Sequence, residues 1–234
     1  MIKIKNTDVY GFETAIRGMR NPWNSWEKSD SVYSDAHNCE ECAHKEDFSV
    51  CYSSHIYNCF DFIIGENDLA LMKKLVSAGT DHSKFMRMIN VTVDITAPLY
   101  WWKEFDTYKV GTVRNSCSTM HTITAKEFEL KDFSHEHLNE GSLDVLGRTI
   151  FHLNAYREEF SRTKDIDDWR QIIQLLPSSY NQRATVQLNY AVLRNMYHSR
   201  KNHPLDEWRD FCRWIETLPY SELITGGNVD EMQP

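Results

Sequence analysis

The stretch that decides the expected fold, residues 97–121, reads APLYWWKEFDTYKVGTVRNSCSTMH. Its first half is aromatic with interspersed charges, and its second half is a run of hydroxyl, amide and cationic side chains. The proline is predicted to lie in the first turn of a helix that Thr96 or Ala97 caps and that ends near Tyr108. The polar run beyond is typical either of a solvated surface loop or of a surface that hydrogen-bonds a flat polar ligand.

The segments on either side predict an α+β protein with few strands and many helices. Residues 2–5 (IKIK) and 88–96 (MINVTVDIT) alternate as strands do, whereas residues 14–26 (TAIRGMRNPWNSW) predict a structured turn. Helices are predicted for residues 66–79, for about 20 residues after a Ser142 cap, and for Trp169 to Leu176. Two further apolar stripes each predict a helix: Val186, Tyr190, Leu193 and Tyr197, and then Leu205, Trp208, Cys212 and Ile215.

Length and charge limit the class of protein. The 234 residues suit one domain, expected over residues 1–225 with a Cys/His-rich insert at about 29–59 and a flexible tail at 226–234. The net charge is −8 without a basic block, which argues against binding to duplex nucleic acid. No apolar run reaches the ~18 residues that span a bilayer, and no secretory signal opens the chain. We therefore expect no membrane partner and a cytoplasmic protein.

The insert contains a candidate metal site. Cys39 and Cys42 have the C-x-x-C spacing of a zinc site, and Cys51 and Cys59 could complete a four-sulfur set. The second pair lacks the tight spacing, so free thiols in a variable insert are the alternative.

A second polar group lies near the C-terminus. Asn189 and Arg200 are eleven residues apart, which places them within ~20° of each other on a helix. An amide and a guanidinium on one stripe could bind a carbonyl edge and a phosphate. The alternative is a solvated helix face whose C-terminus Arg200 caps.

Residues 66–121 and 172–215 resemble the flavin-dependent thymidylate synthases. The spacing from His82 through Ala97-Pro98 to Thr119-Met120 matches that family's first motif, and AIRGMRNP is similar to its N-terminal segment. The second motif is matched by Leu176-Pro177, Tyr180, Asn189, Leu193, Asn195 and Arg200. The resemblance covers about half of the chain and rests on spacing and apolar pattern more than on identities.

The chain departs from the family pattern at its signature. Thr107-Tyr108-Lys109 replaces the Arg-His-Arg that holds the flavin, and Glu104 replaces the glutamine that faces the pyrimidine. One lysine thus replaces two arginines. Because lysine cannot make the bidentate contacts of arginine, we expect the flavin diphosphate to bind less well.

The resemblance implies a homotetramer that converts dUMP to dTMP with methylenetetrahydrofolate, NADPH and reduced FAD. It implies that Arg200 meets the nucleotide phosphate, that Glu104, Cys117 and Thr119 line the pyrimidine, and that the site forms between subunits. The implied flavin contacts are His82, Lys84, Thr107, Tyr108, Lys109, Asn189 and Asn195. The alternative is a relative that has lost flavin chemistry and binds a nucleotide or modifies a pyrimidine in another way.

Cys117 carries a separate hypothesis about catalysis. A thiolate beside cations is a good nucleophile, and C6 of uracil accepts such attack. The alternative is a small residue that replaces serine.

Overall fold

The computed structural model describes residues 2–33 and 62–226. The chain divides into two compact units, one made of the strand up to Val9 with Asn90–Thr225, the other of Tyr10–Ile89. We call them the sheet unit and the helical unit. Within the described ranges, no helix is both long enough and apolar enough to cross a membrane.

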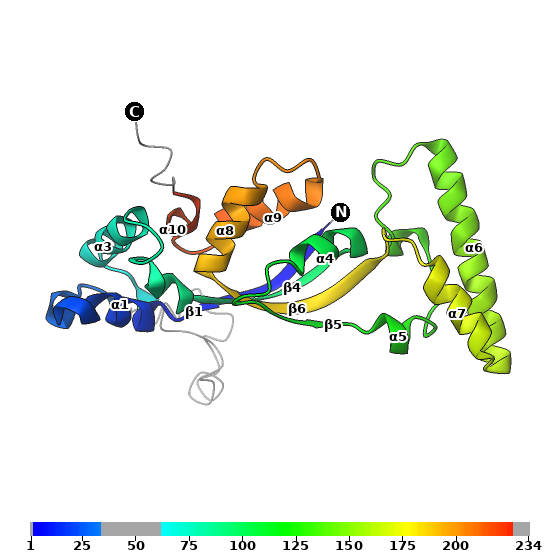
Figure 1. Cartoon of the computed structure of the whole chain (residues 1–234), viewed down its shortest axis with the longest axis horizontal. Helices are drawn as coiled ribbons and strands as arrows, with labels where there is room; N and C mark the ends of the chain where they lie inside the picture. Colours follow the sequence, from blue (N-terminus) through cyan, green and yellow to red (C-terminus); the bar gives the residue numbers. More distant parts are fainter. Residues whose placement is uncertain (1, 34–61, 227–234) are drawn as a thin grey trace, which may run out of the picture. The chain divides into compact units, whose positions relative to one another are not determined.

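A four-stranded sheet organises the sheet unit. Its strands are β1 (Lys3–Tyr10), β4 (Asn90–Pro98), β6 (Asn181–Asn189) and β5 (Val113–Ser116), in the order β1-β4-β6-β5 (Figure 1). β6 pairs antiparallel with β4, from Asn90 opposite Asn189 to Pro98 opposite Asn181, and antiparallel with β5 on its other side. The α+β class and the two predicted strands are confirmed.

The alternation along β4 decides which face of the sheet is covered. Val91, Val93 and Ile95 are at most 1% exposed, whereas Thr92 and Asp94 point to the opposite face. Helices cover the apolar face in Figure 1: α4 (Leu99–Phe105), α8 (Tyr190–Arg200) and α9 (Asp206–Glu216), followed by the short α10 (Glu222–Thr225). Their large aromatic side chains form the core beneath them, with Trp101, Trp208 and Phe211 fully buried.

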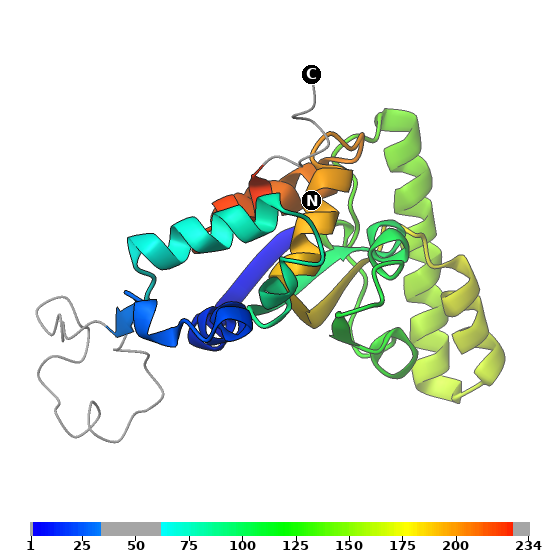
Figure 2. The same ribbon diagram turned by 60° about the vertical axis from the view of Figure 1, so that its left-hand side comes forward.

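Two long helices form a hairpin with its own apolar cluster. α6 (Glu140–Thr163) and α7 (Ile166–Leu175) lie side by side in both views (Figure 2). The short elements α5 (Thr119–Thr122) and η4 (Leu130–Asp132) precede them. The cluster consists of Ile123, Phe128, Phe133, Leu146, Leu153 and Ile172.

The helical unit contains α1 (Phe12–Arg20), α3 (Glu66–Ser77), the strands β2 (Val32–Tyr33) and β3 (Phe62–Ile63), and the 3-10 turns η1 (Asn21–Trp23), η2 (Trp26–Lys28) and η3 (Lys84–Arg87). A buried ion pair joins α1 to α3, with Arg20 Nη2 2.6 Å from Asp68 Oδ1. Ser29 and Ser31 donate to the other oxygen of Asp68, so the buried carboxylate is fully hydrogen-bonded. These hydrogen bonds lower the pKa of Asp68 against the opposing effect of its burial.

The structure corrects the predicted turn at residues 14–26. Most of that segment belongs to helix α1, which buries Phe12, Ala15, Ile16 and Met19. These positions recur at helical spacing, but the arginines and the glycine between them concealed the pattern. The helix begins after Gly11, whose φ of +99° is unfavourable for other residues.

Three predicted helix starts also differ. β4 runs through Pro98, which is itself the N-cap of α4. Proline suits this position because its backbone is extended and it has no N–H group that needs an acceptor. Asn139 rather than Ser142 caps α6, and its side chain accepts from the Ser142 amide. Val186 lies in β6, so the helix predicted to include it begins at Tyr190.

Candidate functional site

Five residues, from three helices and the two loops that follow α4 and α8, meet where α4, α8 and α9 come together. Glu104 lies in the last turn of α4, Tyr108 follows that helix, and Arg200 is the last residue of α8. His203 lies in the loop to α9, and Trp208 lies in the first turns of α9. We call these residues the Arg200 cluster.

The carboxylate of Glu104 is the centre of the cluster. Its Oε2 lies 2.7 Å from Nη1 of Arg200, 3.1 Å from the indole nitrogen of Trp208 and 3.5 Å from Nε2 of His203. Nε of Arg200 donates to the Tyr108 hydroxyl at 2.9 Å. One acid and one guanidinium therefore balance each other inside a ring of hydrogen-bonding partners.

Aromatic rings hold the guanidinium in place. Its carbon lies 4.8 Å from the ring centre of Trp208 and 5.7 Å from that of Tyr108. The Arg200 side chain is 20% exposed and that of Glu104 is 35% exposed, whereas Trp208 is fully buried. The ion pair is thus reached by solvent from one side and rests on the aromatic core on the other.

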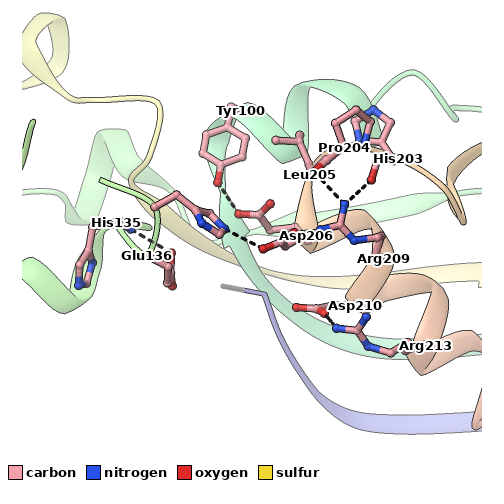
Figure 3. Close-up of polar contacts among 12 residues, drawn as sticks. Tyr100, His135, Glu136, His203, Pro204, Leu205, Asp206, Arg209, Asp210 and Arg213 are labelled. Atoms are coloured by element: carbon pink, nitrogen blue, oxygen red, sulfur yellow. Dashed lines mark hydrogen bonds and ion pairs between the residues drawn. The ribbon is translucent and has the colours of Figure 1, made fainter. Parts of the chain in front are cut away.

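The loop after α8 fixes the imidazole. The Leu205 amide donates to Nδ1 of His203 at 3.2 Å, which leaves Nε2 as the nitrogen that faces Glu104. Arg209 donates to the carbonyls of His203 and Pro204, at 2.6 and 2.8 Å (Figure 3). The loop conformation is therefore set by α9, the helix that also supplies Trp208.

A second arginine, Arg114, lies on β5. Nη1 of Arg114 contacts both carboxylate oxygens of Asp106, at 2.7 and 2.8 Å, and Nη2 donates to Oε1 of Gln182 at 2.5 Å. A cavity of about 110 Å³ lies there, lined by Phe105, Asp106, Tyr108, Lys109, Thr112 and Arg114. Two buried polar atoms in its lining, Thr112 Oγ1 and Arg114 Nε, have no hydrogen-bond partner within the described part of the chain.

A larger cavity, of about 430 Å³, lies along the exposed side of α9 (Figure 3). His137 Nε2 lies 2.7 Å from Asp206 Oδ2, and Arg213 pairs with Asp210. Tyr100 donates to the buried Glu207, and burial, with that carboxylate, raises the pKa of the Tyr100 hydroxyl. The charged groups of this cavity are largely paired with one another.

The structure brings three of the predicted site residues together and separates the others. Arg200, Glu104 and Tyr108 meet in the Arg200 cluster. Lys109 is exposed at the rim of the small cavity, and Thr107 donates to the Glu104 carbonyl at 2.7 Å. Sequence reasoning missed Trp208 and His203 as members of the Arg200 cluster and Arg114 as the partner of Asp106, since no local pattern shows these approaches.

Asn189 does not share a helix face with Arg200. It is the N-cap of α8, with extended backbone, and its side chain accepts from the Val192 amide at 3.1 Å. The predicted stripe assumed one helix through both residues, but the strand ends at Asn189. Asn195 is exposed on α8.

Cys117 and Thr119 lie beyond β5, outside the Arg200 cluster of the same chain. The Cys117 amide donates to Arg183, its carbonyl accepts from Gln182 at 2.8 Å, and its thiol side chain is exposed. Thr119 opens α5, whose N-cap is Ser118. Their convergence with Arg200 between subunits stays a prediction.

The remaining predicted residues lie elsewhere. His82 and Lys84 are exposed in the helical unit. The four cysteines of the zinc hypothesis, Cys39, Cys42, Cys51 and Cys59, fall outside the described residues. Residues 2–33 and 62–226 contain no group of three or more His, Cys, Asp or Glu side chains placed to hold a metal ion.

Trp101 and Trp102 are neighbours on α4, and both face the core. They are 0% and 2% exposed. Trp101 packs on Trp208 and Phe211, and the Trp102 ring supports Arg114. Trp102 thus supports Arg114 directly, whereas Trp101 packs against Trp208, the ring that supports Arg200.

No family model matches the sequence, and no curated protein matches it. Solved structures do resemble it. The flavin-dependent thymidylate synthase ThyX from Helicobacter pylori, complexed with FAD and dUMP, is 18% identical and gives a TM-score of 0.62 over 95% of this chain and 97% of that one. A second structure of that enzyme with FAD and dUMP is 17% identical, with a TM-score of 0.62 over 96% and 97%.

A third similar structure is the UMP/dUMP methylase PolB from Streptomyces cacaoi, bound with 5-Br dUMP. It is 13% identical, with a TM-score of 0.56 over 98% of this chain and 97% of that chain. The similarity therefore extends over nearly the whole length, and the chain has the fold of the flavin-dependent thymidylate synthases.

Proposed function

We propose that this protein is an enzyme that binds a pyrimidine deoxynucleotide and modifies its base. The observation that carries the proposal is Arg200, a guanidinium held rigidly at the solvent-accessible edge of an aromatic core. The fold supports it, because the similar structures hold dUMP or 5-Br dUMP. The specific reaction that the resemblance implies is reductive methylation of dUMP to dTMP with methylenetetrahydrofolate and reduced flavin.

In this proposal Arg200 binds the nucleotide phosphate through the guanidinium N–H groups that Tyr108 and Glu104 leave available. Rigid support matters because a preorganised cation loses little side-chain entropy when the phosphate binds. Glu104, which the resemblance places at the pyrimidine, contacts Arg200 and would therefore also lie near that phosphate. Cys117 and Thr119 would meet the pyrimidine from a second protomer of a homotetramer.

The cavity of about 110 Å³ beside Lys109 and Arg114 is where a flavin diphosphate would have to fit. Lys109 is its exposed cation, while Arg114 is committed to Asp106 and Gln182. Within the described part of the chain, this volume of about 110 Å³ is lined by Lys109, the Asp106 carboxylate and the already paired Arg114, and such a lining does not fit a diphosphate by itself.

That misfit favours a second candidate, a relative that has lost flavin chemistry and binds or modifies a pyrimidine nucleotide in another way. Tyr108 supports it, because the hydroxyl at the centre of the altered signature binds Arg200. The two candidates differ in colour: a purified protein with a flavin absorption band supports the first, and a colourless protein that binds deoxyuridylate supports the second.

Calorimetric titration with dUMP and with FAD tests the proposal. We expect Arg200→Ala to weaken dUMP binding by about 1.5–3 kcal/mol, the usual loss for a hydrogen bond to a charged group. Arg148→Ala is the matched control, because that arginine pairs with Asp144 on the surface of α6. Absence of dUMP binding, or equal affinities of the Arg200 variant and the wild type, would contradict the proposed function.

A further inference from the structure

We propose that Glu104 determines how strongly the site binds anions, because its carboxylate occupies the position at Arg200 that a ligand phosphate needs. This inference rests on the proposed function, in which Arg200 is the phosphate-binding residue. It concerns a regulating property of this chain, namely an internal anion that competes with the ligand.

Three nitrogen atoms converge on one carboxylate oxygen of Glu104. Arg200 Nη1, the Trp208 indole and His203 Nε2 all face Oε2 of Glu104, at 2.7, 3.1 and 3.5 Å. Donors arranged around one anionic oxygen are what a phosphate oxygen also requires. The cluster is therefore an anion site that already contains an anion of its own.

Two contacts hold the Arg200 guanidinium in place independently of Glu104. Arg200 Nε donates to the Tyr108 hydroxyl, and the guanidinium lies over the Trp208 ring. Neither contact involves Glu104. Neutralising Glu104 should leave the guanidinium oriented while removing the charge that opposes an incoming anion.

The backbone that carries Glu104 is held in position by contacts of α4. Thr107 donates to the Glu104 carbonyl at the end of α4, and Tyr100 at the start of the same helix binds the buried Glu207 of α9. α4 and α9 are thereby fastened together, and Trp208 on α9 reaches Glu104. The backbone at Glu104 is thus fixed by packing, so a ligand phosphate can displace the carboxylate only if the Glu104 side chain rotates.

The consequence is selection by charge. A phosphate next to Glu104 experiences repulsion that a neutral nucleoside does not, so the carboxylate lowers affinity for phosphate-bearing ligands only. At a few ångströms and the effective dielectric of a protein surface, this repulsion corresponds to a factor of about ten or more in affinity.

The test compares Glu104→Gln with wild type in calorimetric titrations with inorganic phosphate, deoxyuridylate and deoxyuridine. We expect the variant to bind inorganic phosphate and deoxyuridylate at least about tenfold more tightly. Deoxyuridine reports any effect of position 104 on the pyrimidine itself, and its affinity should change by clearly less than the affinity for deoxyuridylate. Asp144→Asn is the matched control, since it removes a carboxylate paired with Arg148 on α6 and changes the net charge equally. It should leave all three affinities unchanged.

If Glu104→Gln does not fold, Glu104→Asp replaces it in the test, because the shorter side chain keeps the negative charge but moves it away from Arg200. A smaller gain in phosphate affinity is expected. Equal or weaker phosphate binding in the folded variants would overturn the inference. If deoxyuridylate binds both proteins equally, the proposed function stands and the inference fails. If deoxyuridylate binds neither protein while phosphate binds the variant more tightly, the inference stands and the proposed function fails.

Discussion

The guanidinium carbon of Arg114 lies 3.9 Å above the ring centre of Trp102, and the same guanidinium contacts both oxygens of Asp106. Its side chain is 17% exposed. Stacking needs a flat cation, and the guanidinium fork lets Nη1 bind Asp106 while Nη2 binds Gln182, a combination that a lysine ammonium cannot reproduce.

We therefore expect Arg114→Lys to destabilise the protein although the charge is kept. The loss should be on the order of 1 kcal/mol or more, the scale of a desolvated cation–π contact. Urea denaturation measures the free energy of unfolding, and Arg148→Lys, on the exposed surface of α6, is the control. A fully stable Arg114→Lys variant would show that the stacking contributes nothing.

The N-terminus of α6 offers a second prediction. Asn139 accepts from the Ser142 amide at 2.9 Å, so Asn139→Ala should lower the free energy of unfolding by about 1 kcal/mol. Ser142→Ala keeps that amide and should cost much less. The reverse order of the two effects, measured by denaturation, would restore Ser142 as the cap.

Asp94 gives the protein a dependence on acid. It accepts from Thr185, Asn6 and Arg183, and these contacts lower its pKa from 3.8 to about 2. Because the folded-state pKa is the lower one, the carboxylate stabilises the fold above about pH 4 and loses this effect as the pH falls towards 2. In Asp94→Asn the free energy of unfolding should decline less over that interval. Parallel pH profiles for variant and wild type would contradict the assignment.

The two described cysteines should differ in reactivity. Cys117 is exposed, whereas Cys212 is 3% exposed and burial raises its pKa to about 12. Under native conditions at neutral pH, iodoacetamide should modify Cys117 and spare Cys212, and unfolding should remove the difference. Peptide mass spectrometry resolves the two sites. Modification of native Cys212 at the rate of Cys117 would show that the core opens readily.

Trapping with a deoxyuridylate analogue tests the nucleophile hypothesis separately. An adduct that Cys117→Ala abolishes would support covalent attack by this thiol. No adduct, or one that survives the substitution, would leave Cys117 as a small residue in place of serine.

The longer helices from α3 onward and the strands β1 and β4 were predictable because each shows a local periodicity. Val91, Val93 and Ile95 alternate over one strand, and the stripe from Leu205 to Ile215 recurs at helical spacing. Val186 was misplaced because its spacing to Tyr190 fits a helix while its neighbours Ala184 and Leu188 alternate as a strand. The pairing of β6 with β4 resolves that ambiguity.

The amino-acid sequence by itself determined the α+β class, most of the longer helices, the strands β1 and β4, and the presence of Glu104, Tyr108 and Arg200 as polar groups within apolar segments. Only the tertiary structure decided that Arg200 pairs with Glu104, 96 positions away, and that Trp208 and His203 complete the arrangement. The physical reason is that periodicity reports which side of an element is buried, whereas ion pairing depends on how α4, α8 and α9 pack together on the sheet.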